Sequence, residues 1–146
     1  MKIAKEFNWE MGHRLPDHFG KCKNIHGHSY KMMVELDGEL DKNGMVLDYY
    51  ELKKIVNPII ENLDHAFMVN ENDKPVIEFL EKLDSKRVKV KFESTVENIT
   101  RYFLNEIKKH NLPENIHKLK VRVCETPVDY AEEEIELPSK QINRIT

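Results

Sequence analysis

Regular alternation of apolar and polar residues predicts strands near both ends of the chain. Ile3, Phe7 and Trp9 occupy odd positions, mostly against polar neighbours, which predicts a strand over residues 2–9. The same period of two predicts further strands over about residues 27–37, 117–124 and 128–137, and a short strand over residues 88–92 that suits the edge of a sheet. The first two strands are expected to form a hairpin with a long connection.

Apolar residues at helical spacing predict helices in the middle of the chain. Asp48 and Ser94 each precede a glutamate by three residues, which is the capping-box spacing that begins a helix. The predicted helices cover residues 49–62, a shorter stretch that begins at Pro75, and residues 95–109, and residues 63–67 are expected to end the first of them.

The order of these elements predicts an α+β fold. The four main strands follow one another as two hairpins, and the helices lie between them in the sequence. This order favours an antiparallel four-stranded sheet with two main helices on one face, in a single domain that covers residues 1–146. An open sheet has two exposed edges, so we expect oligomerisation by pairing of edge strands.

The composition is that of a globular domain, and it narrows the choice of partners. Hydrophobic residues make up 40% and charged residues 34% of the 146 residues, and 23 Lys and Arg stand against 26 Asp and Glu. The net charge of −3 gives no general attraction to nucleic acid or to an anionic membrane. No apolar stretch could span a bilayer and the first residues lack a signal-peptide apolar region, so we expect a cytoplasmic protein.

The two cysteines are too few for a disulfide framework, and both are expected to be free thiols. Cys124 continues an apolar strand and is expected to be buried and without a role. Cys22 lies four residues before His26, between Lys21 and Lys23. These charges and a nearby dication would favour its thiolate, which could act as a general base. The alternative is an inert surface cysteine.

Three histidines form the strongest candidate for a chemical site. His26 and His28 are two residues apart at the start of a predicted strand, so both imidazoles point to the same face. His13 follows the first strand, whose end lies beside the start of the second in an antiparallel hairpin. Three histidines and an open position fit a catalytic zinc ion, whereas a structural zinc takes four ligands and Cys22 could supply the fourth. Ordinary polar side chains near a loop are the remaining alternative.

Two other places carry weaker signals. Asp64 and His65 follow the first helix, where the carboxylate could hold the tautomer of the imidazole, although such pairs are more often polar residues of a helix end. Glu125 directly follows an apolar strand. It could point into a pocket and bind an amidine-like edge through two hydrogen bonds, or it could be a solvated glutamate.

Six short motifs occur in a fixed order between about residues 3 and 130. They are His13-Arg14-Leu15, Cys22-x3-His26-Gly27-His28-Ser29-Tyr30, Gly44-Met45-Val46-Leu47-Asp48-Tyr49, Leu63-Asp64-His65, Ser94-Thr95-x-Glu97-Asn98 and Cys124-Glu125-Thr126. As a set they resemble the 6-pyruvoyltetrahydropterin synthase / 6-carboxytetrahydropterin synthase family. The resemblance implies the tunnelling fold, in which the sheets of several subunits join into a barrel. It also implies a hexamer of two trimers with active sites at subunit interfaces.

The resemblance gives each candidate residue a role. The three histidines match the zinc ligands, and Cys22 matches the cysteine that abstracts a proton. Asp64 and His65 match a dyad that acts on the other side of the substrate. Glu125 matches the carboxylate that anchors the pterin and is counted in the charge relay, and Thr95 matches a threonine that helps to bind the pterin.

The substrate implied by the resemblance is 7,8-dihydroneopterin triphosphate. Zinc would bind its side-chain oxygens and acidify the neighbouring C–H bond, and triphosphate would be eliminated. One branch of the family forms 6-pyruvoyltetrahydropterin, and the other releases acetaldehyde and forms 6-carboxy-5,6,7,8-tetrahydropterin for 7-deazaguanine (queuosine-type) synthesis. The short gap between Cys22 and His26, and Asp48 with Tyr49, resemble the carboxy branch, whereas Phe19 to Cys22 resembles the pyruvoyl branch. The carboxy branch is favoured.

Several questions stay open at this point. Residues 68–93 look longer than in short bacterial members of the family and could reshape the pocket. Arg14, Lys21 and Lys23 are all candidates for binding the triphosphate. Two other functions remain as alternatives: a zinc-stabilised pterin-binding module in which Cys22 completes the site, and aldol cleavage of unphosphorylated dihydroneopterin.

Overall fold

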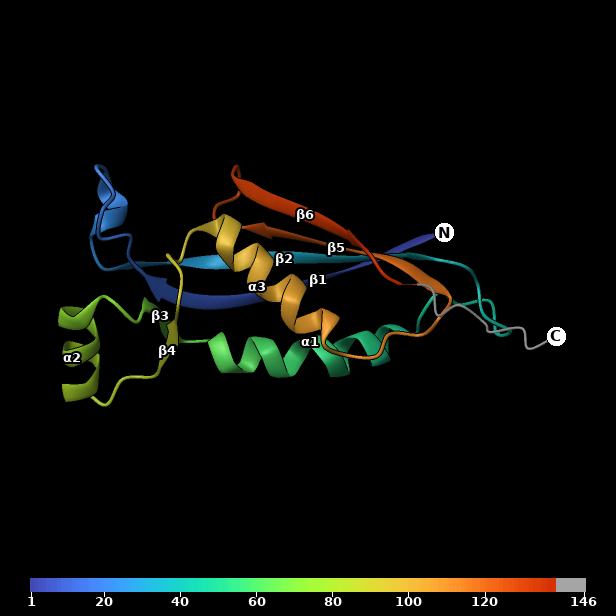
Figure 1. The fold of residues 1–146 in the computed structure, drawn as a ribbon, viewed down its shortest axis with the longest axis horizontal. Helices are drawn as coiled ribbons and strands as arrows, with labels where there is room; N and C mark the ends of the chain where they lie inside the picture. The colour runs from blue at the N-terminus through green and yellow to red at the C-terminus, as the bar shows by residue number, and fades with distance from the viewer. Residues whose placement is uncertain (139–146) are drawn as a thin grey trace.

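The computed structural model describes residues 1–138, which form one six-stranded sheet with α1 and α3 on one face (Figure 1). The strand order across the sheet is β4-β3-β1-β2-β5-β6. The strands are β1 (Lys2–His13), β2 (His26–Gly38), β3 (Ala66–Asn70), β4 (Arg87–Val90), β5 (Ile116–Cys124) and β6 (Tyr130–Glu136). The helices are α1 (Tyr49–Leu63), α2 (Lys74–Lys82), α3 (Val96–Lys108) and a single 3-10 turn, η1 (Lys21–Lys23). The predicted α+β class is confirmed.

The core lies between the sheet and the helices α1 and α3. Odd residues of β1 and even residues of β2 point to this side, as the alternating burial of both strands shows. Trp9 stacks on Tyr30 across the two strands with ring centroids 5.1 Å apart, and Phe103 of α3 packs against Trp9 at 4.9 Å. All three rings are buried, so they join the hairpin to the helical layer.

The sheet has six strands, so the prediction of four strands is wrong. β3 and β4 run parallel to each other, and β3 pairs with the end of β1 at Met11 and Gly12. Sequence reasoning assigns the start of β3 to a helix end, because residues 66–69 are apolar throughout and lack the alternation of a half-exposed strand. Both faces of β3 are covered: Met68 belongs to the main core, whereas Phe67 packs with α2 in a second cluster.

Side chains cap the N-termini of α1 and α3. Asp48 Oδ1 accepts a hydrogen bond of 2.8 Å from a backbone N–H of the first turn of α1, as predicted. In α3 the cap is Thr95, whose Oγ1 accepts from the Asn98 N–H at 3.3 Å, and not Ser94 as the capping-box spacing predicts. Ser94 is buried and lies beside His13 instead. None of the helices within residues 1–138 is long and apolar enough to cross a membrane.

Two glycines allow the strands to approach closely at the end of the hairpin. A Cβ atom on Gly27 would lie 2.9 Å from the carbonyl oxygen of Met11, and a Cβ atom on Gly12 would lie 2.8 Å from a ring carbon of β3. The absence of side chains therefore lets β1 lie tightly between β2 and β3. This is the point at which His13 and His26 stand opposite each other.

Candidate active site

The three candidate histidines lie together at the end of the β1–β2 hairpin. His13 ends β1 and is directly opposite His26, the first residue of β2, in the antiparallel register. His28 lies two residues further along β2, on the same face. One ring nitrogen from each residue belongs to a group whose atoms all lie within 4.8 Å of one another. The rings thus converge on one point.

Backbone carbonyls orient two of the three rings. His13 Nδ1 lies 2.8 Å from the carbonyl oxygen of Ser94, and His26 Nδ1 lies 2.7 Å from that of Asn24. A carbonyl oxygen only accepts hydrogen bonds, so both Nδ1 atoms carry the proton and both Nε2 atoms present lone pairs. Within residues 1–138, the Nε2 atoms of all three histidines are buried and have no hydrogen-bond partner.

Three buried ring nitrogens that have no hydrogen-bond partner within residues 1–138 fit a metal ion. Burial lowers the pKa of His13 to about 4 and also lowers the pKa of His28, so both rings are neutral near pH 7. Neutral imidazole is the form that binds metals, and a carbonyl bound to Nδ1 is a common way of fixing such a ligand. Three histidine nitrogens suit a four-coordinate ion that keeps one position open.

Glu125 joins the histidine cluster from the end of β5. It follows Cys124 and continues the strand alternation onto the face of the core. Its Oε1 lies 3.3 Å from His13 Nε2 and 3.5 Å from His28 Nε2, and it accepts a hydrogen bond of 3.4 Å from the Tyr30 hydroxyl. Burial, and after it the charge of Glu125, raises the pKa of Tyr30, so the phenol remains a donor. The structure thus places this carboxylate beside the histidines.

Both cysteines are free thiols with intermediate exposure. Among residues 1–138, the thiol of Cys22 does not belong to the group of converging nitrogens, so the geometry does not make it a fourth ligand. Cys22 contributes less than burial and Glu125 to the raised pKa of Tyr30, so Cys22 lies near the Tyr30 hydroxyl. The expectation that Cys124 is buried is wrong: its position opposite Lys31 places it on the outward face of the sheet, where it is partly exposed.

Asp64 and His65 form a hydrogen-bonded pair after α1. His65 Nδ1 lies 2.9 Å from Asp64 Oδ2, and Asp64 Oδ1 accepts from the Glu10 N–H at 2.9 Å. The backbone bond from Glu10, and after it the bond from His65, lowers the pKa of Asp64, which stays ionised and keeps the imidazole proton on Nδ1. His65 has a φ of 56°, which is uncommon for a residue other than glycine, and its N–H donates to the Glu10 carbonyl at 2.7 Å.

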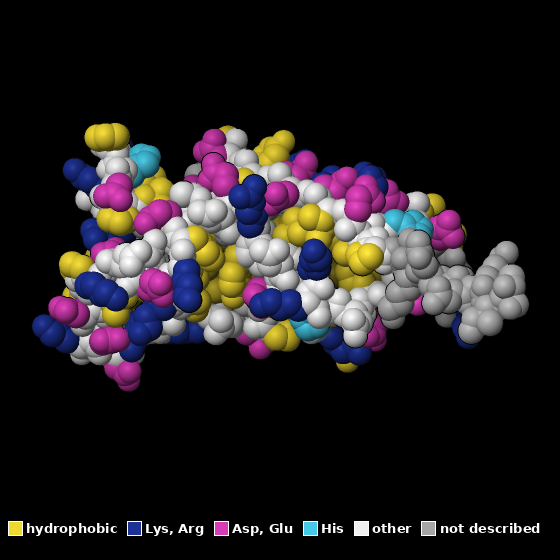
Figure 2. All heavy atoms as spheres, viewed as in Figure 1, with side chains coloured by type: hydrophobic (Ala, Val, Ile, Leu, Met, Phe, Trp, Pro, Cys, Tyr) yellow, Lys and Arg dark blue, Asp and Glu magenta, His cyan; other side chains and the backbone are white. Residues whose placement is uncertain are grey.

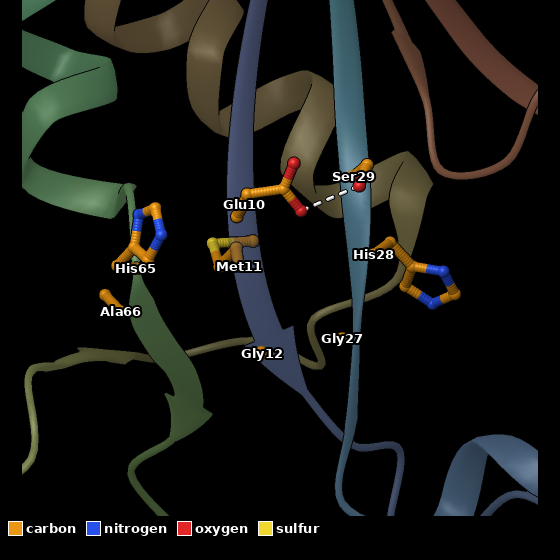
Figure 3. A pocket seen from close by; sticks show the side chains of 8 residues that line it. All are labelled: Glu10, Met11, Gly12, Gly27, His28, Ser29, His65 and Ala66. Carbon is orange, nitrogen blue, oxygen red and sulfur yellow. Dashed lines mark hydrogen bonds between the residues drawn. The ribbon is translucent and has the colours of Figure 1, made fainter.

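Within one chain, the Asp64–His65 pair does not face the histidine cluster. His28 and His65 line one open pocket of about 350 Å³ at the end of the hairpin. Figure 3 shows that β1 and β2 lie between the two rings and that the His28 ring points away from His65. The structure therefore brings together the three histidines and Glu125, but it leaves the Asp64–His65 pair on the other side of the hairpin.

Sequence reasoning misses the groups that orient the metal-site histidines. The carbonyls of Ser94 and Asn24 act through the backbone, so no side-chain pattern could reveal them. Tyr30 carried a usable signal, since strand alternation places it on the face of His28. Thr95 caps α3 and directly follows Ser94, whose carbonyl holds His13.

Arg14 is not available as a free cation. Its Nε and Nη2 donate to the two carboxylate oxygens of the buried Asp73 at 2.7 and 2.6 Å. This bidentate pair occupies one edge of the guanidinium and balances its charge. Of the three basic candidates for binding a triphosphate, the exposed Lys21 and Lys23 of η1 have no ion pair within the part of the chain that the structure describes.

The fold and the histidine cluster together define a metal-binding protein of the tunnelling fold. A 6-pyruvoyl tetrahydropterin synthase from Plasmodium vivax has the same fold, with a TM-score of 0.76 over 94% of this chain and 98% of that chain at 20% identity. The enzyme of that name from Caenorhabditis elegans gives a TM-score of 0.70 over 92% of this chain and 95% of that chain at 29% identity. Residues 2–136 match the family model described as 6-pyruvoyl tetrahydropterin synthase, and the chain belongs to this family.

Sequence relatives from bacteria carry a more specific name. A Haemophilus influenzae protein named 6-carboxy-5,6,7,8-tetrahydropterin synthase is 42% identical over 139 residues, which cover 90% of this chain and 96% of that protein. An Aquifex aeolicus protein of the same name is 30% identical over an alignment that covers 90% of this chain and 96% of that protein. The family resemblance drawn from the six motifs is confirmed.

Proposed function

We propose that this protein is a 6-carboxy-5,6,7,8-tetrahydropterin synthase, which converts 7,8-dihydroneopterin triphosphate with release of acetaldehyde and triphosphate. The observation that carries the proposal is the histidine cluster, in which three buried Nε2 atoms without partners surround one point beside Glu125. The relatives named for the carboxy product favour this branch over the pyruvoyl branch.

We assign zinc as the metal, held by the Nε2 atoms of His13, His26 and His28. Zinc bound there supplies a Lewis acid that favours loss of a proton from an adjacent substrate carbon. The thiol of Cys22 lies outside the ligand group in the described part of the chain, which supports a catalytic site with an open position over a closed structural site.

Glu125 and Thr95 are proposed to bind the pterin ring. Oε1 of Glu125 is oriented by the Tyr30 hydroxyl, and its carboxylate could accept two hydrogen bonds from the amino-pyrimidinone edge. Thr95 begins α3 and directly follows Ser94, whose carbonyl holds the ring of His13. Binding by these residues would fix the substrate side chain over the open metal position.

Cys22 and the Asp64–His65 pair are proposed to move protons at the substrate side chain. Cys22 would remove a proton as the thiolate, which the flanking Lys21 and Lys23 favour by charge. Asp64 holds the proton of His65 on Nδ1, so Nε2 of His65 is the atom that exchanges protons with the substrate. Because His28 of the histidine cluster and His65 lie on different sides of the hairpin, we propose that the pair comes from a neighbouring subunit.

The free edges of the sheet support this assembly. Residues 2–10 of β1 pair only with β2, since β3 reaches β1 only at Met11 and Gly12, and β6 pairs only with β5 among residues 1–138. Pairing of β6 with β1 of the next subunit would close a ring of sheets. We propose a hexamer of two trimers, located in the cytoplasm and acting in 7-deazaguanine (queuosine-type) synthesis.

Product analysis tests this function. Zinc-loaded protein is incubated with 7,8-dihydroneopterin triphosphate, and released triphosphate and acetaldehyde are measured, with metal-free protein as the control. The proposal predicts both products in equal amounts. Triphosphate without acetaldehyde would place the protein in the pyruvoyl branch, and intact substrate with zinc bound would contradict the lyase function altogether.

A further inference from the structure

Glu10 places a carboxylate in the pocket that contains His65. It lies on β1 directly opposite Ser29 of β2, on the face of the sheet away from the core. Ser29 Oγ donates a hydrogen bond of 2.7 Å to Glu10 Oε2. Figure 3 shows this pair on the hairpin, between His65 on one side and His28 on the other. Glu10, Ser29 and His65 line the same pocket of about 350 Å³.

The backbone of Glu10 also fixes the Asp64–His65 pair. Its N–H donates to Asp64 Oδ1 at 2.9 Å, and its carbonyl accepts from the His65 N–H at 2.7 Å. Two hydrogen bonds thus lock one residue of β1 to the turn after α1. The Glu10 carboxylate is therefore held in a defined position relative to the His65 ring by the rigid sheet.

The charge of this carboxylate is not neutralised by the protein. No Lys or Arg forms an ion pair with Glu10 in residues 1–138, whereas Glu6, on the same strand and face, is 3.6 Å from Lys31 Nζ. Ser29 occupies Oε2, and Oε1 has no hydrogen bond from the described residues. An ionised carboxylate is an acceptor only, so this part of the pocket suits a ligand that donates hydrogen bonds and repels phosphate.

We propose that Glu10 is a substrate-binding residue that accepts hydrogen bonds from the hydroxyl groups of the pterin side chain beside His65. The inference rests on the proposed function, in which the Asp64–His65 pair acts at that side chain. The hydroxyl groups are the donors nearest to the reacting carbons, and Glu125, whose Oε1 lies 3.3 Å from His13 Nε2, is assigned to the pterin ring in the proposed function. Repulsion by Glu10 directs the triphosphate away from the Asp64–His65 pair.

Two pterins that do not turn over separate this role from catalysis. Neopterin carries the hydroxylated side chain without phosphate, and 6-methylpterin carries no hydroxyl group. Their affinities are measured by calorimetry for zinc-loaded wild-type protein and for Glu10→Ala, Glu10→Gln and the matched control Glu6→Ala. Loss of a hydrogen bond to a charged group predicts that Glu10→Ala binds neopterin at least about 10-fold more weakly. Binding of 6-methylpterin is expected to stay within about two-fold, and Glu6→Ala should change neither affinity.

Each other outcome has one meaning. If Glu10→Ala weakens both pterins equally or neither, Glu10 does not contact the side chain and the inference is overturned while the pterin function stands. If wild-type protein binds neither pterin, the proposed function fails and this inference fails with it. Glu10→Gln keeps an acceptor for Ser29 and removes the charge, so it gives the same comparison if Glu10→Ala does not fold.

Discussion

At the scale of single residues, His13 is the side chain on which most of the site depends. Its ring is fully buried, its Nδ1 is held by the Ser94 carbonyl, and its Nε2 faces the other two histidines. The hydrogen bond and the burial keep the ring neutral and correctly turned before any ligand arrives. Packing of the core around His13 therefore determines where its Nε2 atom lies in the site.

The buried His13 ring predicts acid sensitivity of the metal-free protein. Its pKa in the folded state is about 4, below its ordinary value of 6.5, so the unfolded chain binds more protons between these values. The free energy of unfolding should therefore fall as the pH drops from 6.5 to 4, by roughly 3 kcal/mol from this group. Urea unfolding with a chelator present, at several pH values across this window, measures it. The variant His13→Gln should lose this part of the pH dependence, and an equal slope in both proteins would contradict the account.

The Arg14–Asp73 pair is a second residue whose loss has a defined consequence. The Asp73 side chain is 5% exposed and holds both ends of the guanidinium, so Asp73→Ala leaves a partly buried cation without its partner. We expect a loss of about 1–3 kcal/mol in the free energy of unfolding. Glu81→Ala is the control, because the Glu81 side chain is 47% exposed and its ion pairs are longer, at 3.7 and 3.8 Å, so its loss should cost less than about 0.5 kcal/mol. If urea unfolding gives equal losses of stability for the two variants, the bidentate pair stabilises the fold no more than the Glu81 pairs do.

At the scale of elements, the end of the β1–β2 hairpin sets the geometry of the metal site. A Cβ on Gly27 would lie 2.9 Å from the backbone of β1, which cannot move without shifting the strand. Gly27→Ala should therefore cost about 1–3 kcal/mol in stability and weaken zinc binding, because Gly27 lies between two of the ligands. Gly20→Ala is the control, since its Cβ would meet only the movable His18 ring. The zinc affinity of each variant is measured by competition with a chelator. Unchanged affinity in Gly27→Ala would contradict the claim that the end of the hairpin sets the geometry of the metal site.

How far the sequence predicts these elements depends on how each is buried. β1, β2, β5 and β6 have one face on the core, so alternation reveals them, and antiparallel pairing then brings His13 to His26. β3 is buried on both faces and shows no alternation, so it is missed. The short edge strand predicted over residues 88–92 corresponds to β4, but it is not counted among the four main strands, so the predicted sheet is two strands narrower than the observed one. The role of Ser94 is missed because it acts through its backbone carbonyl. Glu10 is missed because its side chain looks like an ordinary exposed carboxylate and its bond to Asp64 is made by its backbone.

At the scale of the whole molecule, the proposed function requires that subunits assemble. His28 lies on one side of the hairpin and His65 on the other (Figure 3). The other two histidines of the cluster and Glu125 lie beside His28. The outer surface in Figure 2 mixes acidic and basic side chains over most of the visible face, without a patch of one charge that would suit a nucleic acid. The free edges of β1 and β6 remain the natural contacts between subunits.

Assembly of this kind predicts complementation between two inactive variants. Cys22→Ala lacks the thiol, and His65→Ala lacks the imidazole of the pair, so each should be inactive alone. The two variants are then unfolded and refolded together. With random pairing of subunits, about a quarter of the sites should contain both groups, Cys22 from one subunit and His65 from its neighbour. Refolding of the double variant with itself is the control. No recovered activity, with mixed oligomers present, would place both groups of a site in the same chain.

The most direct test of the central claim compares the two cysteine variants for zinc content and for products. The account assigns three ligands to histidines and a proton-transfer role to Cys22. It predicts that folded Cys22→Ala keeps its full zinc content and loses acetaldehyde and triphosphate release by at least about 100-fold. The matched variant Cys124→Ala, whose thiol is on the outward face, should keep both zinc and activity. Loss of zinc from folded Cys22→Ala, or full activity in that variant, would contradict the account.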